Sequence, residues 1–280
     1  MTTTPRGVTT RKPEPGFLQR IAGDRRRRIE EAKLRTPAHV LRSRLGPALP
    51  AGRLERPLRR GRAAEPLRLV CEVKRASPSA GVLNAEIDPV ATARLYESGG
   101  AAAISLVTEP DHFLGQLDWV DAVRPAVRVP ILLKDFVLDS YQVLDAAVRG
   151  ADGVLLIAAL LSAVLLQRLI TEARLLGLDC LVEVHSRDEL RRAIVSGATL
   201  VGINNRDLDT FEVDLETSFE LLPHVPPLVT AVAESGLSAP EHLARLRQTR
   251  CDAVLVGEAF MRSPDPAATL ATLARAAAGS

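Results

Sequence analysis

The sequence predicts an α/β protein built as a closed (β/α)8 TIM barrel with a helical N-terminal extension. From Leu69 onward, short β-type runs alternate with longer helical patterns, which is typical of a parallel sheet with crossover helices. Eight such units occupy roughly 210 residues, as a barrel of this kind requires. No G-x-G-x-x-G motif follows the first strand, which argues against a dinucleotide-binding fold.

Three regions are expected along the chain. Residues 1–15 predict a disordered tail, since they contain Thr, Pro and charge without periodicity. Residues 16–66 predict a helical extension and linker, and residues 67–280 the catalytic barrel. The extension should form an amphipathic helix broken at Thr36-Pro37, then a short second helix, then a linker rich in Pro, Gly and Arg. The apolar face of the first helix would consist of Phe17, Ile21, Ile29, Ala32 and Leu34, with Arg25 to Arg28 in solvent.

The barrel elements follow from hydrophobic runs bounded by turn residues. The predicted strands are 68–74, 102–107, 129–134, 153–157, 179–183, 199–203, 228–233 and 252–256. The predicted helices centre on 88–98, 117–125, 140–149, 162–176, 187–196, 214–222, 238–247 and 264–277.

Composition limits the function classes. The chain is 46% hydrophobic and 25% charged, which is typical of globular proteins, and its 3% aromatic content argues against stacking platforms for single-stranded nucleic acid. Its longest near-apolar run, 153–166, is shorter than the ~20 residues of a membrane span. Cys71, Cys180 and Cys251 form no C-x-x-C pair, so we expect no disulfide framework and a cytoplasmic location.

Charge is distributed unevenly. Residues 1–62 hold 17 Lys or Arg against 5 Asp or Glu, whereas the remainder holds 19 against 29. A basic N-terminal arm is compatible with nucleic-acid binding, with a solvated helix face, or with steering of an anionic substrate.

Charged residues at the strand ends predict an acid/base site. Glu72 and Lys74 are two apart on the first strand, so they share the face of Val70, opposite Leu69, Cys71 and Val73. Barrels of this kind carry their chemistry at the carboxyl ends of the strands, where Lys134 and Glu183 should also lie. Charged groups in one partly dry cavity shift one another's pKa values. We therefore expect burial and Lys74 to lower the pKa of Lys134.

The last two loops predict a phosphate site. Ser235-Gly236 and Gly257 each lead into a helix, and glycines at helix N-termini present backbone N–H groups to anions. Tight turns alone are the simpler explanation of these glycines. Glu258 should turn its side chain away and offer only its backbone N–H.

Two other chemistries are less well supported. Glu183 and His185 form an E-x-H pair, but no third metal ligand stands at a convincing spacing. Ser77, Ser79 and Ser235 have no evident His–Asp relay. We therefore expect neither a metal nor a serine nucleophile.

Several stretches together resemble the indole-3-glycerol-phosphate synthase family of tryptophan biosynthesis, from about residue 16 to the C-terminus. They are CEVKRASPSAGVL (71–83), ISLVTEPDHFLGQLDWV (104–120), ILLKDFVLDSYQV (131–143), GADGVLLIAALL (150–161), LVEVHSRDEL (181–190), VGINNRDL (201–208), VAESGL (232–237) and AVLVGEAFMR (253–262).

The resemblance implies a cofactor-free lyase that converts 1-(2-carboxyphenylamino)-1-deoxyribulose 5-phosphate to indole-3-glycerol phosphate, CO2 and water. It implies that Lys134 is the general acid, Lys74 holds the substrate carboxylate, Glu183 is an acid/base partner and Glu72 tunes Lys74. Asn204 and Ser235 would assist catalysis. Substrate binding would involve Ser77, Pro78, Phe113, Phe136, Leu155, Arg206 and Glu234, and the phosphate would lie against Ser77, Gly236, Gly257 and Glu258.

Three departures from the family pattern stand out. Leu133 replaces a common Arg and should face the helices; the segment before the first strand is short and Arg-rich; and SAVLLQRL opens a helix that is usually acidic there. The alternatives are a related barrel acting on another phosphorylated ribulose, such as a phosphoribosylanthranilate isomerase, and a non-catalytic nucleic-acid-binding protein. Lys74, Lys134 and Glu183 disfavour both. The expected partner is a phosphorylated small molecule, without nucleic acid or membrane, and the expected state is a monomer or a weak homodimer.

Overall fold

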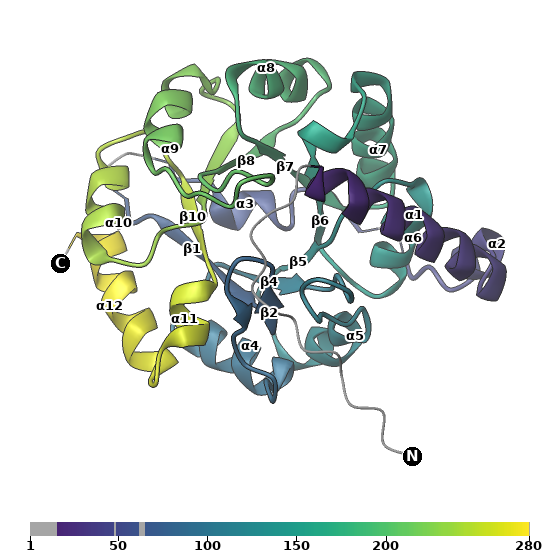
Figure 1. Cartoon of the computed structure of the whole chain (residues 1–280), viewed down its shortest axis with the longest axis horizontal. Helices are drawn as coiled ribbons and strands as arrows, with labels where there is room; N and C mark the ends of the chain where they lie inside the picture. Colours follow the sequence, from purple (N-terminus) through teal and green to yellow (C-terminus); the bar gives the residue numbers. More distant parts are fainter. Residues whose placement is uncertain (1–15, 48, 62–64, 280) are drawn as a thin grey trace.

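Eight parallel strands close into a barrel, as predicted (Figure 1). The computed structural model describes residues 16–47, 49–61 and 65–279, so the predicted disordered tail lies outside the described residues. Around the barrel the strands follow the order β1-β10-β9-β8-β7-β6-β5-β4. They span β1 (Arg68–Val73), β4 (Ala103–Val107), β5 (Ile131–Lys134), β6 (Gly153–Ile157), β7 (Asp179–Val184), β8 (Leu200–Asn204), β9 (Thr230–Glu234) and β10 (Ala253–Val256).

Helices surround the strands in an outer ring (Figure 1). The ring consists of α4 (Pro89–Ser98), α5 (Asp118–Val123), α6 (Ser140–Val148), α7 (Ala163–Leu175), α8 (Arg187–Val195), α9 (Glu216–Leu221), α10 (Pro240–Arg247) and α12 (Pro266–Ala278). Short elements absent from the prediction are the hairpin β2 (Ala76–Ser77) and β3 (Gly81–Val82), the helix α11 (Glu258–Arg262), and the 3-10 turns η1 (Arg124–Ala126), η2 (Ala158–Leu160) and η3 (Leu222–His224). No helix in the described part of the chain is long and apolar enough to span a membrane.

Alternation along each strand produces two hydrophobic layers. Val70 belongs to the cluster that fills the barrel, whereas Leu69, Cys71 and Val73 belong to the cluster between strands and helices. Leu133 also lies in the outer cluster, which confirms that it faces the helices. The inward positions at the carboxyl ends are therefore free to carry polar chemistry.

The helix α1 (Phe17–Arg35) crosses the barrel beside α6 and the turn η2, and α2 (Ala38–Arg42) follows the predicted break (Figure 1). The Tyr141 hydroxyl donates to the carbonyl oxygens of Ala32 and Thr36 at 3.1 and 2.8 Å and so fixes the end of α1. Two details of the prediction were wrong. Leu34 is 85% exposed instead of buried, and Arg25 leaves solvent to pair with Asp135 at 2.7 Å.

The predicted linker contains a further helix, α3 (Glu55–Leu58), which closes the amino end of the barrel. Leu54 and Leu58 are buried and pack with the barrel interior. The Asp179 carboxylate, at the start of β7, accepts backbone N–H groups of Gly52, Leu54 and Glu55 at 2.6, 2.8 and 2.9 Å. A partner more than a hundred residues away thus stabilises this short helix.

Candidate active site

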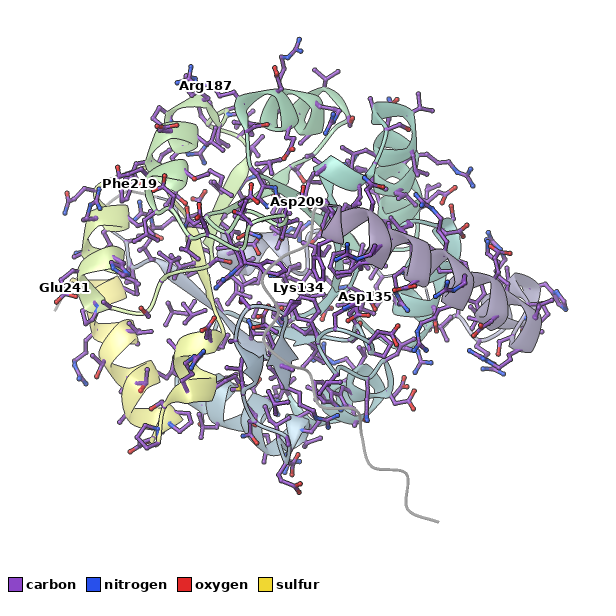
Figure 2. The ribbon with its side chains drawn as sticks, viewed as in Figure 1. Lys134, Asp135, Arg187, Asp209, Phe219 and Glu241 are labelled. Carbon is purple, nitrogen blue, oxygen red and sulfur yellow. The ribbon has the colours of Figure 1, made fainter. Side chains whose placement is uncertain are left out.

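A cavity of about 390 Å³ opens at the carboxyl ends of the strands. Figure 2 shows Lys134 near the centre of the molecule, whereas Arg187, Phe219 and Glu241 lie on its outer helices. All but one of the predicted site residues line the cavity: Glu72, Lys74, Ser77, Pro78, Phe113, Lys134, Phe136, Leu155, Glu183, Asn204, Arg206, Ser235, Gly236, Gly257 and Glu258. The exception is Glu234, which is fully buried and contacts Lys134.

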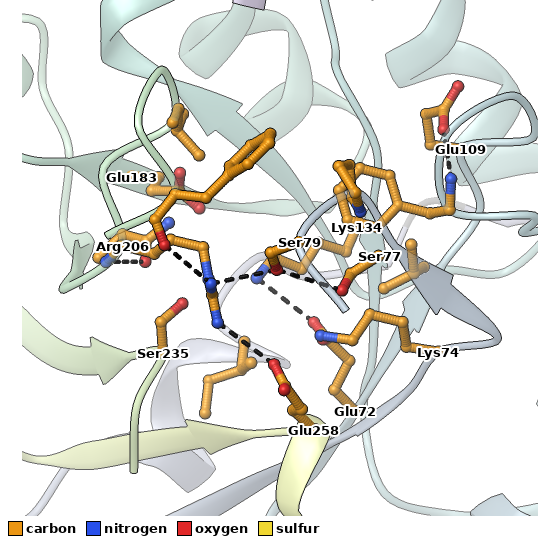
Figure 3. A pocket seen from close by; sticks show the side chains of 18 of the residues that line it. Glu72, Lys74, Ser77, Ser79, Glu109, Lys134, Glu183, Arg206, Ser235 and Glu258 are labelled. Carbon is orange, nitrogen blue, oxygen red and sulfur yellow. Dashed lines mark hydrogen bonds and ion pairs between the residues drawn. The ribbon is translucent and has the colours of Figure 1, made fainter. Parts of the chain in front are cut away.

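Ion pairs connect the charged side chains on the cavity floor (Figure 3). Lys74 Nζ lies 3.0 Å from one carboxylate oxygen of Glu72, and Lys134 Nζ lies 3.3 Å from the other. Lys134 Nζ also donates to Oε2 of Glu234 at 2.9 Å. Glu72 therefore bridges the two lysines, and Lys134 lies between two buried carboxylates.

Burial and neighbouring charges shift the pKa values of Glu72 and Glu234 in opposite directions. Burial alone would raise the pKa of Glu72, but the ammonium groups of Lys134 and Lys74 outweigh it and lower that pKa to about 2. Burial dominates at Glu234, where it outweighs the attraction of Lys134 and, with the nearby charge of Glu183, raises the pKa to about 7. The site thus combines one permanently ionised carboxylate with one that exchanges a proton near neutrality.

The predicted direction of the Lys134 pKa shift was wrong. Burial would lower its pKa, as expected, but the carboxylates of Glu234, Glu72 and Glu183 outweigh burial and raise the pKa of Lys134 above its usual value. The sequence did not show that Glu234, 100 residues later, meets Lys134 across the barrel. Lys134 is consequently held as an ammonium ion.

Two glycines make room for the buried carboxylates. A Cβ atom on Gly202 would lie 2.0 Å from Oε1 of Glu234, and one on Gly257 would lie 2.7 Å from Oε1 of Glu72. Any side chain at either position would have to displace a charged group from the cavity floor. Gly257, which the sequence pattern places in a phosphate loop, therefore also makes room for Glu72 on the cavity floor.

At the predicted phosphate end, Ser235 and Gly236 both adopt positive φ angles of 63° and 75°. Arg206 lies between them and the opposite wall: its Nη1 donates to Ser79 Oγ at 3.1 Å and its Nη2 to Glu258 Oε2 at 3.2 Å (Figure 3). The expectation that the Glu258 side chain turns away was wrong. Its carboxylate faces Arg206 and Arg262, whose guanidinium groups compensate its charge.

The apolar wall of the cavity extends beyond the predicted residues. The rings of Phe113 and Phe136 lie 6.2 Å apart, and Phe17, Leu18 and Ile21 of α1 complete the wall. The sequence pattern had marked Phe17 and Ile21 as the buried face of α1, but it could not show that this face covers a cavity.

Buried acidic residues beside the cavity were also missed. Glu109 accepts the backbone N–H groups of Asp111, His112 and Phe113 at 2.9, 2.7 and 2.9 Å and so shapes the loop that carries Phe113. Asp135 accepts from Thr108 Oγ1 at 2.8 Å and from Arg25. The TEPD and KDF stretches contain a signal for both, namely an acidic residue directly after an apolar strand. Among the described residues, no group of three or more His, Cys, Asp or Glu side chains is arranged to hold a metal ion.

Fold and site together define an enzyme of the (β/α)8 class, with a cluster of ionisable side chains at the carboxyl ends of the strands. Residues 18–273 match the family model of indole-3-glycerol phosphate synthase. Named members of that family include a protein of Carboxydothermus hydrogenoformans, 42% identical over 92% of this chain and 99% of its own length. Another, from Sulfurimonas denitrificans, is 47% identical over 75% of this chain and 80% of its own. The chain belongs to the indole-3-glycerol phosphate synthase family.

Solved structures with lower identity share the fold alone. A 3-hexulose-6-phosphate synthase superposes with a TM-score of 0.62 at 17% identity, covering 75% of this chain and 99% of its own. Thiamine phosphate pyrophosphorylase from Pyrococcus furiosus gives 0.58 at 20% identity, covering 77% and 98%. The predicted barrel and the predicted family are therefore both confirmed.

Proposed function

We propose that the cavity carries out the family's reaction, in which 1-(2-carboxyphenylamino)-1-deoxyribulose 5-phosphate becomes indole-3-glycerol phosphate with loss of CO2 and water. The observation that carries the proposal is the Lys134 ammonium group, held between Glu72 and Glu234 at the floor of a cavity with an apolar wall and a glycine-lined end. Each end of the cavity matches one part of this substrate.

The substrate would lie with its aromatic ring against Pro78, Phe113, Phe136 and Leu155. Its ring carboxylate would pair with Lys74, and its phosphate would meet the backbone N–H groups near Gly236 and Gly257, with Ser77 beside it. Asn204, Arg206 and Ser235 would bond the sugar hydroxyls and the phosphate end. Such an arrangement brings the ring carbon and the ketone carbon into reacting distance.

Ring closure would begin at Lys134. As the ring carbon that bears the carboxylate attacks the ketone carbon, the carbonyl oxygen takes a proton from the Lys134 ammonium group. An oxygen that is turning into an alkoxide is more basic than an amine, so even a lysine with a raised pKa can donate to it. The same pKa keeps the acid form populated throughout the neutral range.

Decarboxylation and dehydration complete the reaction. The carboxylate leaves as CO2, and the electron pair of the broken bond restores the aromatic ring. The new hydroxyl then leaves as water with a proton from Lys74, while Glu183 takes the proton lost from the adjacent carbon. Glu72 holds both lysines in place, and Glu234 sets the charge state of Lys134.

Turnover of the purified protein tests this proposal, because the product's indole ring is detected by absorbance and fluorescence. Lys134→Met should lower kcat by at least about 100-fold, with the fold intact by circular dichroism. Lys134→Arg is the matched variant, since it keeps the positive charge but is not a usable acid at neutral pH. If Lys134→Arg turns over at the wild-type rate, Lys134 is not the proton donor; if the wild type forms no product, the activity itself is wrong.

From the sequence we further propose that the protein is cytoplasmic and that it is a monomer or a weak homodimer. The division at residues 15 and 66 is likewise a prediction.

A further inference from the structure

His185 contacts Glu183 from outside the cavity and takes no part in the proposed reaction steps. Side chains alternate along β7, so Glu183 faces the barrel, Val184 faces the helices, and His185, just past the strand, returns to the side of Glu183. Glu183 lines the cavity and His185 does not. The imidazole is thus placed to act on Glu183 without touching substrate.

The two ring nitrogens of His185 face two different carboxylates. Nδ1 lies 3.3 Å from Oε2 of Glu189, and Nε2 lies 3.5 Å from Oε1 of Glu183. Neither Nε2 of His185 nor Oε1 of Glu183 has a hydrogen-bond partner among the described residues. Both atoms are buried, and buried polar atoms are normally partnered.

Glu189 is itself held in place by the backbone. It stands in the first turn of α8, where its N–H donates to Oγ of Ser186 at 3.3 Å, and its carboxylate accepts the backbone N–H of His185 at 2.8 Å. This arrangement resembles a capping box, except that the glutamate accepts the N–H of the residue before the N-cap Ser186 instead of that of Ser186 itself. Glu189 therefore presents a fixed acceptor to Nδ1.

The position of the protons follows from these contacts. A carboxylate such as Glu189 only accepts hydrogen bonds, so Nδ1 must carry a proton. In a neutral ring Nε2 would then be a bare acceptor facing Oε1 of Glu183, which is also an acceptor. A single additional proton, carried by Nε2 or by Glu183, removes this conflict.

The surroundings favour keeping that proton on the ring. Burial would lower the pKa of His185, but the hydrogen bond that its ring donates to Glu189 and the charges of Glu183, Glu189 and Glu234 outweigh burial and raise it. Asp207, from the loop after β8, also lies within electrostatic reach of the ring. The charged groups with the largest effects on the pKa of His185 are therefore acidic, while the cations Arg192 and Lys134 act on the two carboxylates that flank the ring.

We propose that His185, held by its contact with Glu189, is a positioning residue. It keeps Glu183 in its reactive orientation and keeps a proton available to Oε1 of Glu183. The proton moves between Nε2 of His185 and Oε1 of Glu183, and the ring alternates between the cationic and neutral forms. This inference rests on the acid/base role proposed for Glu183.

Two variants separate this role from helix capping. His185→Gln keeps a polar side chain but loses the titrating proton. Glu189→Gln keeps an oxygen acceptor for the backbone N–H of His185 but loses the charge that supports the ring. His224→Gln, at an exposed histidine of η3, is the matched control.

Steady-state kinetics on the 280-residue chain, from pH 6 to 9, give the first readout. We expect His185→Gln to lower kcat about tenfold at pH 6.5 with KM within twofold of wild type, and Glu189→Gln to lower it by a smaller factor. The difference should shrink as the pH rises, because the wild-type ring then loses its proton as well. A purely structural role would give the same ratio at every pH.

Titration of the His185 ring by NMR gives a readout independent of turnover. We expect its pKa to lie above the ordinary histidine value in the wild type and to fall in Glu189→Gln. The inference is overturned if the ring titrates at its ordinary pKa, or if His185→Gln retains the wild-type kcat across the pH range. Absence of product from the wild type would instead refute the proposed function, and the NMR titration would still test the His185–Glu189 pair.

Discussion

At the scale of single residues, the site depends on charges that meet across the barrel. Strand alternation was enough to predict that Glu72 and Lys74 share a face of their strand and that Leu133 faces the helices. It could not predict the ion pair of Lys134 with Glu234, because that contact depends on how the strands close and on the space left by Gly202. The sign of the Lys134 pKa shift was wrong for this reason.

Glu234→Gln tests the cost of this burial. In the folded protein the pKa of Glu234 is raised to about 7, so the folded state binds its proton more tightly than the unfolded chain does. The stability contributed by this group is therefore full at low pH and is lost as the pH rises towards and through 7. Glu234→Gln should raise the unfolding free energy more at pH 8.5 than at pH 5.5, by at most about 3 kcal/mol. The melting temperature should therefore rise more at the higher pH. The substitution should also lower kcat.

Differential scanning calorimetry at the two pH values measures the effect. Glu220→Gln, on the exposed side of α9, provides the control and should behave alike at both. An equal change in melting temperature at pH 5.5 and 8.5 for Glu234→Gln would contradict the raised pKa.

At the scale of elements, the barrel units were predictable because each strand and helix buries a regular apolar pattern. Observed strand limits fall within two residues of the predicted ones. The helix α3 was not predictable, because its four residues carry little periodicity and its N–H groups bond to Asp179, far along the chain. The contacts of α1 were missed similarly, since Arg25 faces a carboxylate 110 residues later.

The ion pair between Arg25 and Asp135 should connect α1 to substrate binding. Asp135 follows Lys134 directly and also bonds Thr108, while α1 contributes three apolar residues to the cavity wall. Arg25→Ala should loosen α1 and raise KM about tenfold, equivalent to about 1.4 kcal/mol, with kcat changed less than threefold. Steady-state kinetics check this against Arg26→Ala, an exposed neighbour on the same helix. Equal KM values for the two variants would exclude the connection.

At the scale of the whole molecule, one end of the barrel holds the candidate active site and the other end is closed by packing and hydrogen bonds. The ionisable side chains of the candidate site lie at the carboxyl ends of the strands, whereas Leu54, Leu58 and Asp179 close the amino ends. This division is characteristic of the fold, so it was predictable in outline. The residues that close the amino end were not predicted.

Asp179→Ala should therefore reduce stability without reducing turnover. It removes the acceptor of three backbone N–H groups, which should cost about 2–4 kcal/mol in unfolding free energy. Urea denaturation measures the loss, and kcat per folded molecule should stay within twofold of wild type. Glu86→Ala, at an exposed loop position, should change neither. A large loss of kcat in folded Asp179→Ala would show that the two ends are coupled.

The N-terminal segment has a consequence for the order in which the molecule can be assembled. The Arg25 side chain donates to Asp135, the backbone N–H of Leu54 donates to Asp179, and the backbone N–H of Arg60 donates to Asp252 at 3.0 Å. During synthesis each of these residues emerges before its partner, which follows 110, 125 and 192 residues later. The helices at the two ends of the barrel thus reach these partners only after Asp135, Asp179 and Asp252 have been synthesised. Part of this segment therefore lacks its final contacts until Asp252 has been synthesised.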